Sequence, residues 1–237
     1  MRGKNGGRWP GVPHGERTGD DGCGTEGGGW VPAGLPGRRG YAGAEVVHAV
    51  ERLVGVERRV LRELGSIEST VLDTALPRLS RAADHGVLWV VIAGGLAVSG
   101  PSGRRAAVRG LAALSLASVT TNVLVKRAAG RRRPPAGLVP AAREPRRVPF
   151  TTSFPSGHAA SAAAFTTAVA LELPATAIPL APLAFAVAAS RVVIGVHYPS
   201  DVIAGVALGM AAAGVTRRGL RDDWPAQERR ERDRDRD

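Results

Sequence analysis

Five long apolar runs constrain the fold of this chain more than any other feature of its sequence. They hold only two charged residues, Arg109 and Glu172, whereas water-soluble helices of comparable length normally have a charged face. The runs cover residues 86–100, 106–125, 159–173, 175–190 and 202–216. We therefore expect an all-α fold, an integral membrane helical bundle with about five to six core helices.

The length of the runs bears on how they cross a bilayer. A span needs roughly 20 apolar residues, and only residues 106–125 reach that length without flanking residues. Ala and Gly dominate the runs, and Gly205 and Gly209 form a small-xxx-small pair that lets helices approach closely. A buried bundle in a water-soluble protein is the alternative. We favour a multi-pass protein of the cell membrane.

The two ends of the chain differ from this apolar middle. Residues 1–42 are rich in Gly, Pro and Arg without apolar periodicity, and residues 217–237 are a mixture of charges. Such segments bury too little apolar surface to offset their ordering entropy, so we expect disordered tails. Residues 81–216 form the expected helical core. Residues 43–80 hold a connector and an amphipathic helix over 44–64, which lies on a membrane surface or packs on a partner helix.

The charge of the chain points to an anionic partner. The formal net charge is +11 and comes mostly from arginine, which is typical of proteins that bind nucleic acid, a membrane surface or a phosphorylated substrate. A single cysteine, Cys23, excludes an intramolecular disulfide and a multi-cysteine zinc site.

Three polar clusters interrupt the apolar runs. Residues 126–134 follow the second run, residues 155–158 precede the third, and residues 190–201 join the fourth to the fifth. If successive runs alternate in direction, all three clusters lie at one end of the bundle. That end would then collect Lys126, Arg133, His158, Arg191, His197 and Asp201.

These residue types suit the chemistry of a phosphoryl group. Three cations and a helix N-terminus make a site for a multiply charged oxyanion such as phosphate. Two imidazoles can serve as nucleophile and acid, and a carboxylate can orient one of them. The sequence places no cluster of Asp and Glu here to hold magnesium, so we expect phosphoryl transfer without a metal ion or a cofactor.

The spacing within the clusters is specific. The residues that carry it are Lys126, six residues, Arg133-Pro134; then Pro155-Ser156-Gly157-His158; then Ser190-Arg191, five residues, His197, three residues, Asp201. In type, order and spacing they resemble the three-part signature of the type 2 phosphatidic acid phosphatase and vanadium haloperoxidase superfamily. The resemblance covers residues 81–216, and all three motifs in order are strong evidence where one alone would be weak.

The resemblance implies that the bundle hydrolyses phosphate esters or anhydrides through a phosphohistidine intermediate. His197 would be the nucleophile, and Asp201 would accept the other ring N–H of His197. His158 would protonate the leaving oxygen and later activate water.

The same resemblance assigns the phosphate-binding groups. Lys126, Arg133 and Arg191 would hold the phosphoryl oxygens as charge spreads over them. Ser156 and the backbone N–H of Gly157 would add donors at the start of the third apolar helix.

The leading hypothesis for the activity is a membrane-bound lipid phosphatase. Its substrate would join a phosphate or diphosphate head to a long apolar tail, as in polyprenyl diphosphate or phosphatidic acid, because the polar clusters meet the headgroup layer. Residues 79–86 also resemble the phosphatase part of actinobacterial proteins that fuse this domain to a lipid kinase, although no kinase domain is present here. The expected partners are a phosphorylated lipid substrate and membrane lipids, not nucleic acid.

Two other functions and the orientation stay open. A vanadium-dependent haloperoxidase would use His197 as its vanadate ligand. A non-catalytic membrane protein would bind anionic lipid or nucleic acid through its arginines. The family resemblance favours catalytic loops that face outward, with Arg104 and Arg105 in the cytoplasm, whereas counting the arginines of the catalytic-side loop favours the opposite orientation. We favour the outward orientation.

Overall fold

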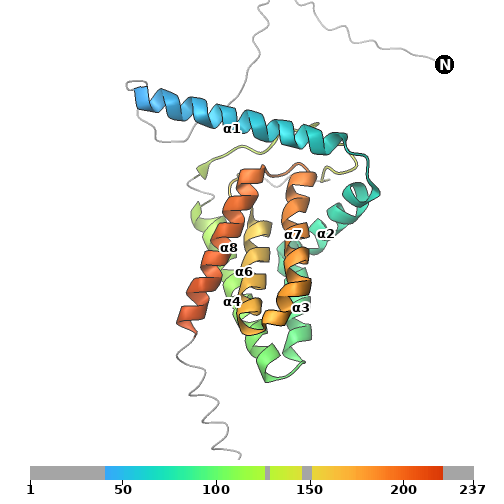
Figure 1. Ribbon diagram of the computed structural model, residues 1–237, viewed down its shortest axis with the longest axis vertical. Helices are drawn as coiled ribbons and strands as arrows, with labels where there is room; N and C mark the ends of the chain where they lie inside the picture. Colours follow the sequence, from blue (N-terminus) through green and yellow to red (C-terminus); the bar gives the residue numbers. More distant parts are fainter. Residues whose placement is uncertain (1–40, 126–128, 146–150, 221–237) are drawn as a thin grey trace, which may run out of the picture.

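Every regular element of the described residues is a helix (Figure 1). The structure is a computed structural model that describes residues 41–125, 129–145 and 151–220. Within these ranges the α-helices are α1 (Tyr41–Ser66), α2 (Leu76–Ala82), α3 (Val87–Ala97), α4 (Pro101–Val119), α6 (Gly157–Glu172), α7 (Ala177–Val193) and α8 (Pro199–Gly219). Short helical turns connect them: η1 (Val71–Ala75), η2 (Asp84–Gly86), η3 (Thr120–Val125) and η4 (Pro174–Thr176). The expectation of an all-α bundle is confirmed.

The helix α6 is the centre of the bundle and packs against α4, α7 and α8 (Figure 1). Nine of its residues are buried, most of them alanine, as expected of a helix that is apolar on all sides. Among the described residues, three helical stretches are long and apolar enough to cross a membrane: Pro101–Val123, Pro174–Val193 and Pro199–Gly219. The fourth and fifth apolar runs therefore reach spanning length with residues that flank them.

Small residues hold α6 close to its neighbours. A Cβ atom at Gly205 would overlap the carbonyl oxygen of Ser156, and one at Gly209 would overlap that of Ala160. On the other side, a Cβ atom at Gly110 of α4 would lie 2.8 Å from the ring of Phe165. The small-xxx-small pair on α8 therefore lets two helices approach closely, as the sequence predicts. It brings α8 against the first turn of α6.

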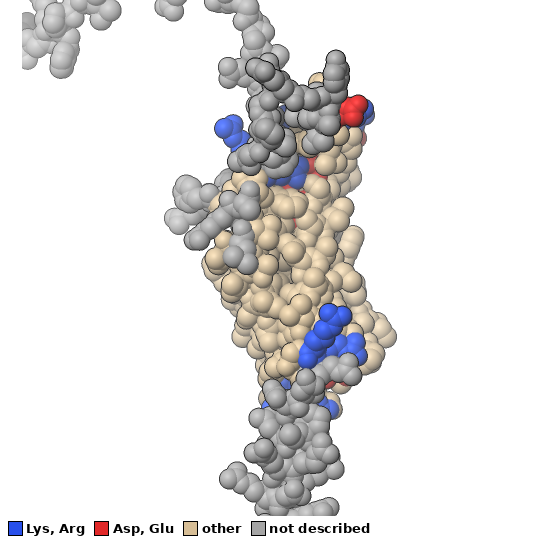
Figure 2. Space-filling model, turned by 90° about the vertical axis from the view of Figure 1, so that its left-hand side faces the viewer, with Lys and Arg blue, Asp and Glu red and all other residues tan. Residues whose placement is uncertain are grey.

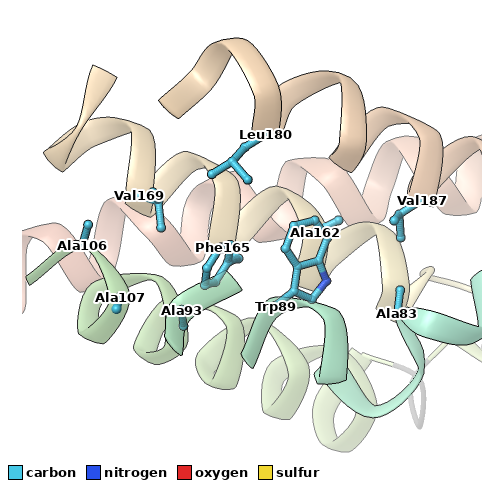
Figure 3. Close-up of a cluster of buried hydrophobic side chains, with 10 residues drawn as sticks. All are labelled: Ala83, Trp89, Ala93, Ala106, Ala107, Ala162, Phe165, Val169, Leu180 and Val187. Atoms are coloured by element: carbon cyan, nitrogen blue, oxygen red, sulfur yellow. The ribbon is translucent and has the colours of Figure 1, made fainter. Parts of the chain in front are cut away.

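Two aromatic residues fill the remaining core. Trp89 of α3 and Phe165 of α6 have ring centroids 5.3 Å apart, and side chains from α3, α4, α6 and α7 meet around them (Figure 3). Only Ala, Val and Leu surround this pair in the cluster of buried residues, in keeping with an aromatic content of 4%.

The charges of the bundle lie at its two ends. Figure 2 shows a side face whose middle is free of Lys, Arg, Asp and Glu, with blue residues above and below it. The two charges inside the apolar runs, Arg109 and Glu172, form an ion pair with each other. This pattern fits a bundle with its middle in hydrocarbon and its ends in the headgroup layers.

The helix α1 lies across one end of the bundle, over the ends of α7 and α8 (Figure 1). It covers slightly more than the expected residues 44–64. Leu61 on its inner face packs with Val192 and Tyr198, while Leu53 and Val56 are exposed. The predicted tails lie outside the described residues, apart from residues 41–42 in α1 and residues 217–220 at the end of α8.

Candidate active site

The three polar clusters meet at the end of the bundle that α1 crosses, which we call the site end. The backbone N–H of Ser156 donates to the carbonyl of Asp201 over 2.9 Å, and that of Ser153 donates to the carbonyl of Arg131 over 2.8 Å. The guanidinium of Arg133 reaches the ring of His197. Segments expected to share one end therefore do so. Lys126, the first residue of the signature, lies outside the described residues.

The loop after α7 buries the imidazole of His197. Gly195 turns this loop with φ +71°, a conformation that favours glycine. The N–H groups of Val196 and His197 both donate to the carbonyl of Arg191 over 3.2 Å, which ties the loop to the end of α7. The side chain of His197 is almost completely buried. Its two ring nitrogens are the atoms through which it can contact polar groups.

The two ring nitrogens of His197 face different groups. Nε2 lies 3.4 Å from Nη1 of Arg133. Nδ1 lies 3.5 Å from Oδ2 of Asp201, and among the described residues it has no hydrogen-bond partner. The expected bond from His197 to Asp201 is therefore at the long limit of a hydrogen bond.

Burial is the main cause that lowers the pKa of His197 to about 3, and the nearby cations Arg191 and Arg133 lower it further against the opposing effect of Asp201. The ring is therefore neutral near pH 7, with a lone pair available on one nitrogen. Burial also lowers the pKa of Arg133, and Asp201 counteracts this effect.

The carboxylate of Asp201 is held by more groups than the sequence predicts. It is fully buried in the first turn of α8. Its Oδ2 accepts hydrogen bonds from Ser153 Oγ and, over 2.9 Å, from the N–H of Tyr198. Its Oδ1 accepts one from Nη1 of Arg131 over 2.6 Å. These donors compete for the carboxylate, which explains the long distance to His197.

Backbone carbonyls fix the guanidinium of Arg133 beside the imidazole. Nη1 donates to the carbonyl of Val196 and Nε to that of Thr151, each over 2.9 Å. Nη2 donates to Oγ1 of Thr151 over 3.0 Å. Since these carbonyls carry no net charge, Arg133 keeps its positive charge for a substrate.

Arg191 lies in the wall of a cavity at the site end. Its side chain is buried, Nη1 donates to Ser80 Oγ, and Nε has no hydrogen-bond partner among the described residues. The cavity has a volume of about 690 Å³. It is lined by Pro77, Ser80, Arg81, Asp84, Ala141, Ala142, Arg143, Glu144, Pro145, Arg191, Ile194 and Val196.

The start of α6 supplies the remaining predicted residues. Ser156 is the N-cap of α6 and is fully buried, and Gly157 is the first residue of the helix. In the first turn of the helix, Nε2 of His158 lies 2.8 Å from Oδ1 of Asp84. His158 therefore has a carboxylate partner of its own, from η2.

The family to which the chain belongs follows from a comparison with known protein families. Residues 106–224 match the model of the PAP2 superfamily. The chain belongs to the PAP2 superfamily. The chain is 39% identical over 140 residues to the decaprenylphosphoryl-5-phosphoribose phosphatase of Mycobacterium tuberculosis, a match that covers 58% of this chain and 74% of that protein.

Two further relatives agree with the family and the fold. The lipid A 1-phosphatase of Rhizobium johnstonii is 37% identical over 125 residues, 45% of this chain and 49% of that protein. The transmembrane PAP2-type phosphatidylglycerolphosphate phosphatase of Bacillus subtilis has the same fold, with a TM-score of 0.58 at 21% identity over 76% of this chain and 91% of that one. The chain is a membrane lipid phosphatase, which these relatives favour over both alternatives, the haloperoxidase and the non-catalytic binding protein.

Sequence reasoning missed Ser80, Asp84, Arg131 and Ser153, which bind residues of the predicted site, and Glu57, which binds Arg131. The sequence pattern indicates an interfacial helix start around Asp84 and a positive loop around Arg131. Only the resemblance of residues 79–86 gave a signal for Ser80 and Asp84. A signal for Glu57 was present in the helical pattern, because a carboxylate three residues after Val54 and four before Leu61 lies on the apolar face of α1.

Proposed function

We propose that this phosphatase hydrolyses a lipid phosphate or diphosphate through a phosphohistidine on His197, without a metal ion. The position of Nε2 supports this proposal most directly. It belongs to a buried ring that is neutral near pH 7 and lies 3.4 Å from a guanidinium nitrogen of Arg133. An incoming phosphoryl group would meet a nucleophile and a counter-charge at the same point.

In the first step, Nε2 of His197 attacks phosphorus as the bond from phosphorus to the leaving oxygen breaks. His158 donates a proton to that oxygen, which departs as an alcohol or as a phosphate. Asp84 binds Nε2 of His158 and stabilises the protonated form that donates this proton. Asp201 stabilises the positive charge that the ring of His197 acquires.

The phosphoryl oxygens are held by cations during this step. Arg133 and Arg191 both lie close enough to the ring of His197 to lower its pKa, and we propose that Lys126 joins them. The N–H of Gly157, at the start of α6, adds the positive end of a helix dipole. Ser156 supports this helix start as its N-cap.

In the second step, water attacks the phosphohistidine. The neutral His158 takes a proton from the water molecule as its oxygen bonds to phosphorus. The bond between phosphorus and Nε2 of His197 then breaks, and phosphate leaves. His197 returns to its neutral form and His158 to its protonated form, which completes the cycle.

The substrate class is a phosphate carried by a lipid with a polar head. The relatives act, by their names, on a decaprenyl-linked phosphoribose and on lipid A. The cavity of about 690 Å³ beside Arg191 is larger than one phosphate needs, and Ser80, Arg81, Asp84 and Glu144 give it both donors and acceptors. A sugar phosphate on a prenyl carrier fits this lining, and polyprenyl diphosphate and phosphatidic acid remain substrates to compare with it.

Phosphate release by the purified protein tests the proposal. The panel would hold prenyl-linked sugar phosphate, polyprenyl diphosphate, phosphatidic acid and phosphatidylglycerol phosphate, each with and without EDTA. We expect hydrolysis of at least one of them, undiminished by EDTA and abolished by His197→Ala. Loss of all activity with EDTA would contradict the metal-independent mechanism, and full activity of His197→Ala would contradict the assigned nucleophile.

We also propose that the site end faces outward, so that the end with Arg104 and Arg105 lies in the cytoplasm. The described part of that second end also holds Arg217 and Arg218 in the last turn of α8. These four arginines next to apolar helices support the orientation. A labelling test is given in the Discussion.

A further inference from the structure

Glu57 is a buried carboxylate on the inner face of α1. Only 3% of its surface is exposed, and it lies between Val54 and Leu61 on the face that packs on the bundle. A carboxylate in such a place is costly unless other groups pair with it. Its partners therefore indicate why the helix carries a charge there.

Both oxygens of Glu57 bind groups of the site end. Oε2 forms an ion pair with Nη2 of Arg131. Oε1 accepts the backbone N–H of Ser200 over 2.9 Å. Since Ser200 precedes Asp201 in the chain, this side chain joins α1 to the first turn of α8.

Arg131 connects Glu57 to the carboxylate of Asp201. Its Nη1 donates to Oδ1 of Asp201 over 2.6 Å and to Oγ of Ser200 over 2.7 Å. Its Cζ lies 4.3 Å from the centre of the Tyr198 ring. The guanidinium is therefore fixed on one face and placed between two buried carboxylates.

Glu57, Arg131 and Asp201 form a row in which a cation lies between two carboxylates. The charges of this row explain why two carboxylates are present. Arg131 alone would cancel the charge of Asp201, and the nearby ring of His197 would gain little from that carboxylate. With Glu57 included, the row carries one net negative charge. That charge balances the positive charge which His197 acquires when it binds phosphorus, in a buried place where water screens little.

We propose that Glu57 is a positioning residue that acts through Arg131 on Asp201 and so stabilises the charged ring of His197. The helix α1 thereby contributes to the chemistry of a site whose other residues come from the bundle. This inference rests on the proposed role of His197 as the nucleophile.

The test compares Glu57→Gln with a matched variant on the same helix, Glu63→Gln, whose side chain is exposed. The amide introduced by Glu57→Gln keeps the size of the side chain, and its oxygen can still accept the N–H of Ser200. Its NH2 group replaces the oxygen that faces Arg131, so the variant removes the charge and the ion pair with Arg131. With full-length protein and a lipid phosphate that the wild type hydrolyses, we expect kcat to fall roughly 10- to 100-fold with little change in KM. Glu63→Gln should match the wild type.

Two further variants separate the electrostatic role from a structural one. Glu57→Asp keeps the charge and should recover part of the lost kcat, although it packs less well. In an Asp201→Asn background, Glu57→Gln should cost little more, because its effect passes through Asp201. An unchanged kcat in Glu57→Gln, no recovery in Glu57→Asp, or fully additive losses in the double variant would each overturn the proposal.

The His197→Ala variant distinguishes this proposal from the one on which it rests. If His197→Ala is inactive and Glu57→Gln is fully active, only the role of Glu57 fails. If His197→Ala keeps wild-type activity, the phosphohistidine mechanism itself fails.

Discussion

His158 and Asp84 face each other at the site end, with Nε2 of the imidazole 2.8 Å from Oδ1 of the carboxylate, although 74 residues separate them in the chain. The site therefore holds two imidazole–carboxylate pairs. His197 and Asp201 form the buried pair, and His158 and Asp84 form a pair that solvent reaches, with side chains 21% and 45% exposed. A buried pair suits a nucleophile, and an accessible pair suits a group that exchanges protons with water.

The role of Asp84 can be tested with leaving groups of different basicity. Asp84→Asn removes the charge that stabilises protonated His158, so we expect roughly a 10-fold or larger loss of kcat/KM with a lipid phosphate. p-Nitrophenyl phosphate releases p-nitrophenolate, a leaving group that needs no proton, so the first step with this substrate should be nearly unaffected. Comparing kcat/KM of Asp84→Asn for both substrates makes the measurement, because kcat/KM reports the first step alone, with the exposed Glu68→Gln as the control. Equal losses on the two substrates would contradict a role in protonation.

The buried His197 should make the stability of the protein depend on pH. Its pKa is about 3 in the folded chain and roughly 6.5 when unfolded. Between these values the unfolded chain binds the extra proton, so stability should fall as the pH drops from about 6.5 towards 3. Thermal unfolding of the wild type and of His197→Asn between pH 8 and pH 4 checks this. The decline should be shallower in the variant, and parallel curves would count against a buried neutral ring.

The contact between α6 and α8 should tolerate no added methyl group at Gly205. A Cβ there would overlap the carbonyl oxygen of Ser156, the residue before Gly157 and His158. We expect Gly205→Ala to cost about 1–3 kcal/mol of stability and to lower kcat, because the start of α6 shifts relative to Asp201. Gly214→Ala is the control, since a Cβ at Gly214 meets nothing within 4 Å. Unfolding midpoints and kcat of both variants give the answer, and equal behaviour would contradict the close packing.

The orientation of the site end can be read from cysteine labelling in intact cells. Ala142 is exposed in the loop beside the cavity, and Ser102 is exposed at the start of α4 at the other end. With Cys23 replaced by Ser, a membrane-impermeant maleimide should label Ala142→Cys and leave Ser102→Cys unlabelled until the cells are lysed. The reverse pattern would place the site in the cytoplasm.

Much of the fold follows from properties that the sequence displays directly. The apolar runs set the helices, and their alternation in direction brings residues 126–134, 155–158 and 190–201 to one end. Gly205 and Gly209 indicate the close contact of α8 with its neighbour, because small residues repeated at helical spacing have few other uses in an apolar helix.

The pairings within the site were less accessible to sequence reasoning. Three consecutive arginines, 131 to 133, look alike in the sequence, yet Arg131 binds two carboxylates and Arg133 binds backbone carbonyls beside His197. The difference arises from where the loop turns in space. Asp84 likewise looks like an ordinary interfacial residue until η2 and α6 are placed together. The expected bond between His197 and Asp201 is long because Ser153 and Tyr198 donate to the same oxygen, and no spacing rule reveals that competition.

The central claim, that phosphorus bonds to His197 during turnover, is tested most directly by trapping the intermediate. In His158→Ala the second step lacks its base, so mixing this variant with p-nitrophenyl phosphate and quenching in alkali should preserve a phosphoryl group. Mass spectrometry of the digested protein should find it on the peptide that contains His197, acid-labile and absent from the His158→Ala, His197→Ala double variant. A phosphoryl group on another residue, or none while the single variant still releases p-nitrophenol in a burst, would contradict the account.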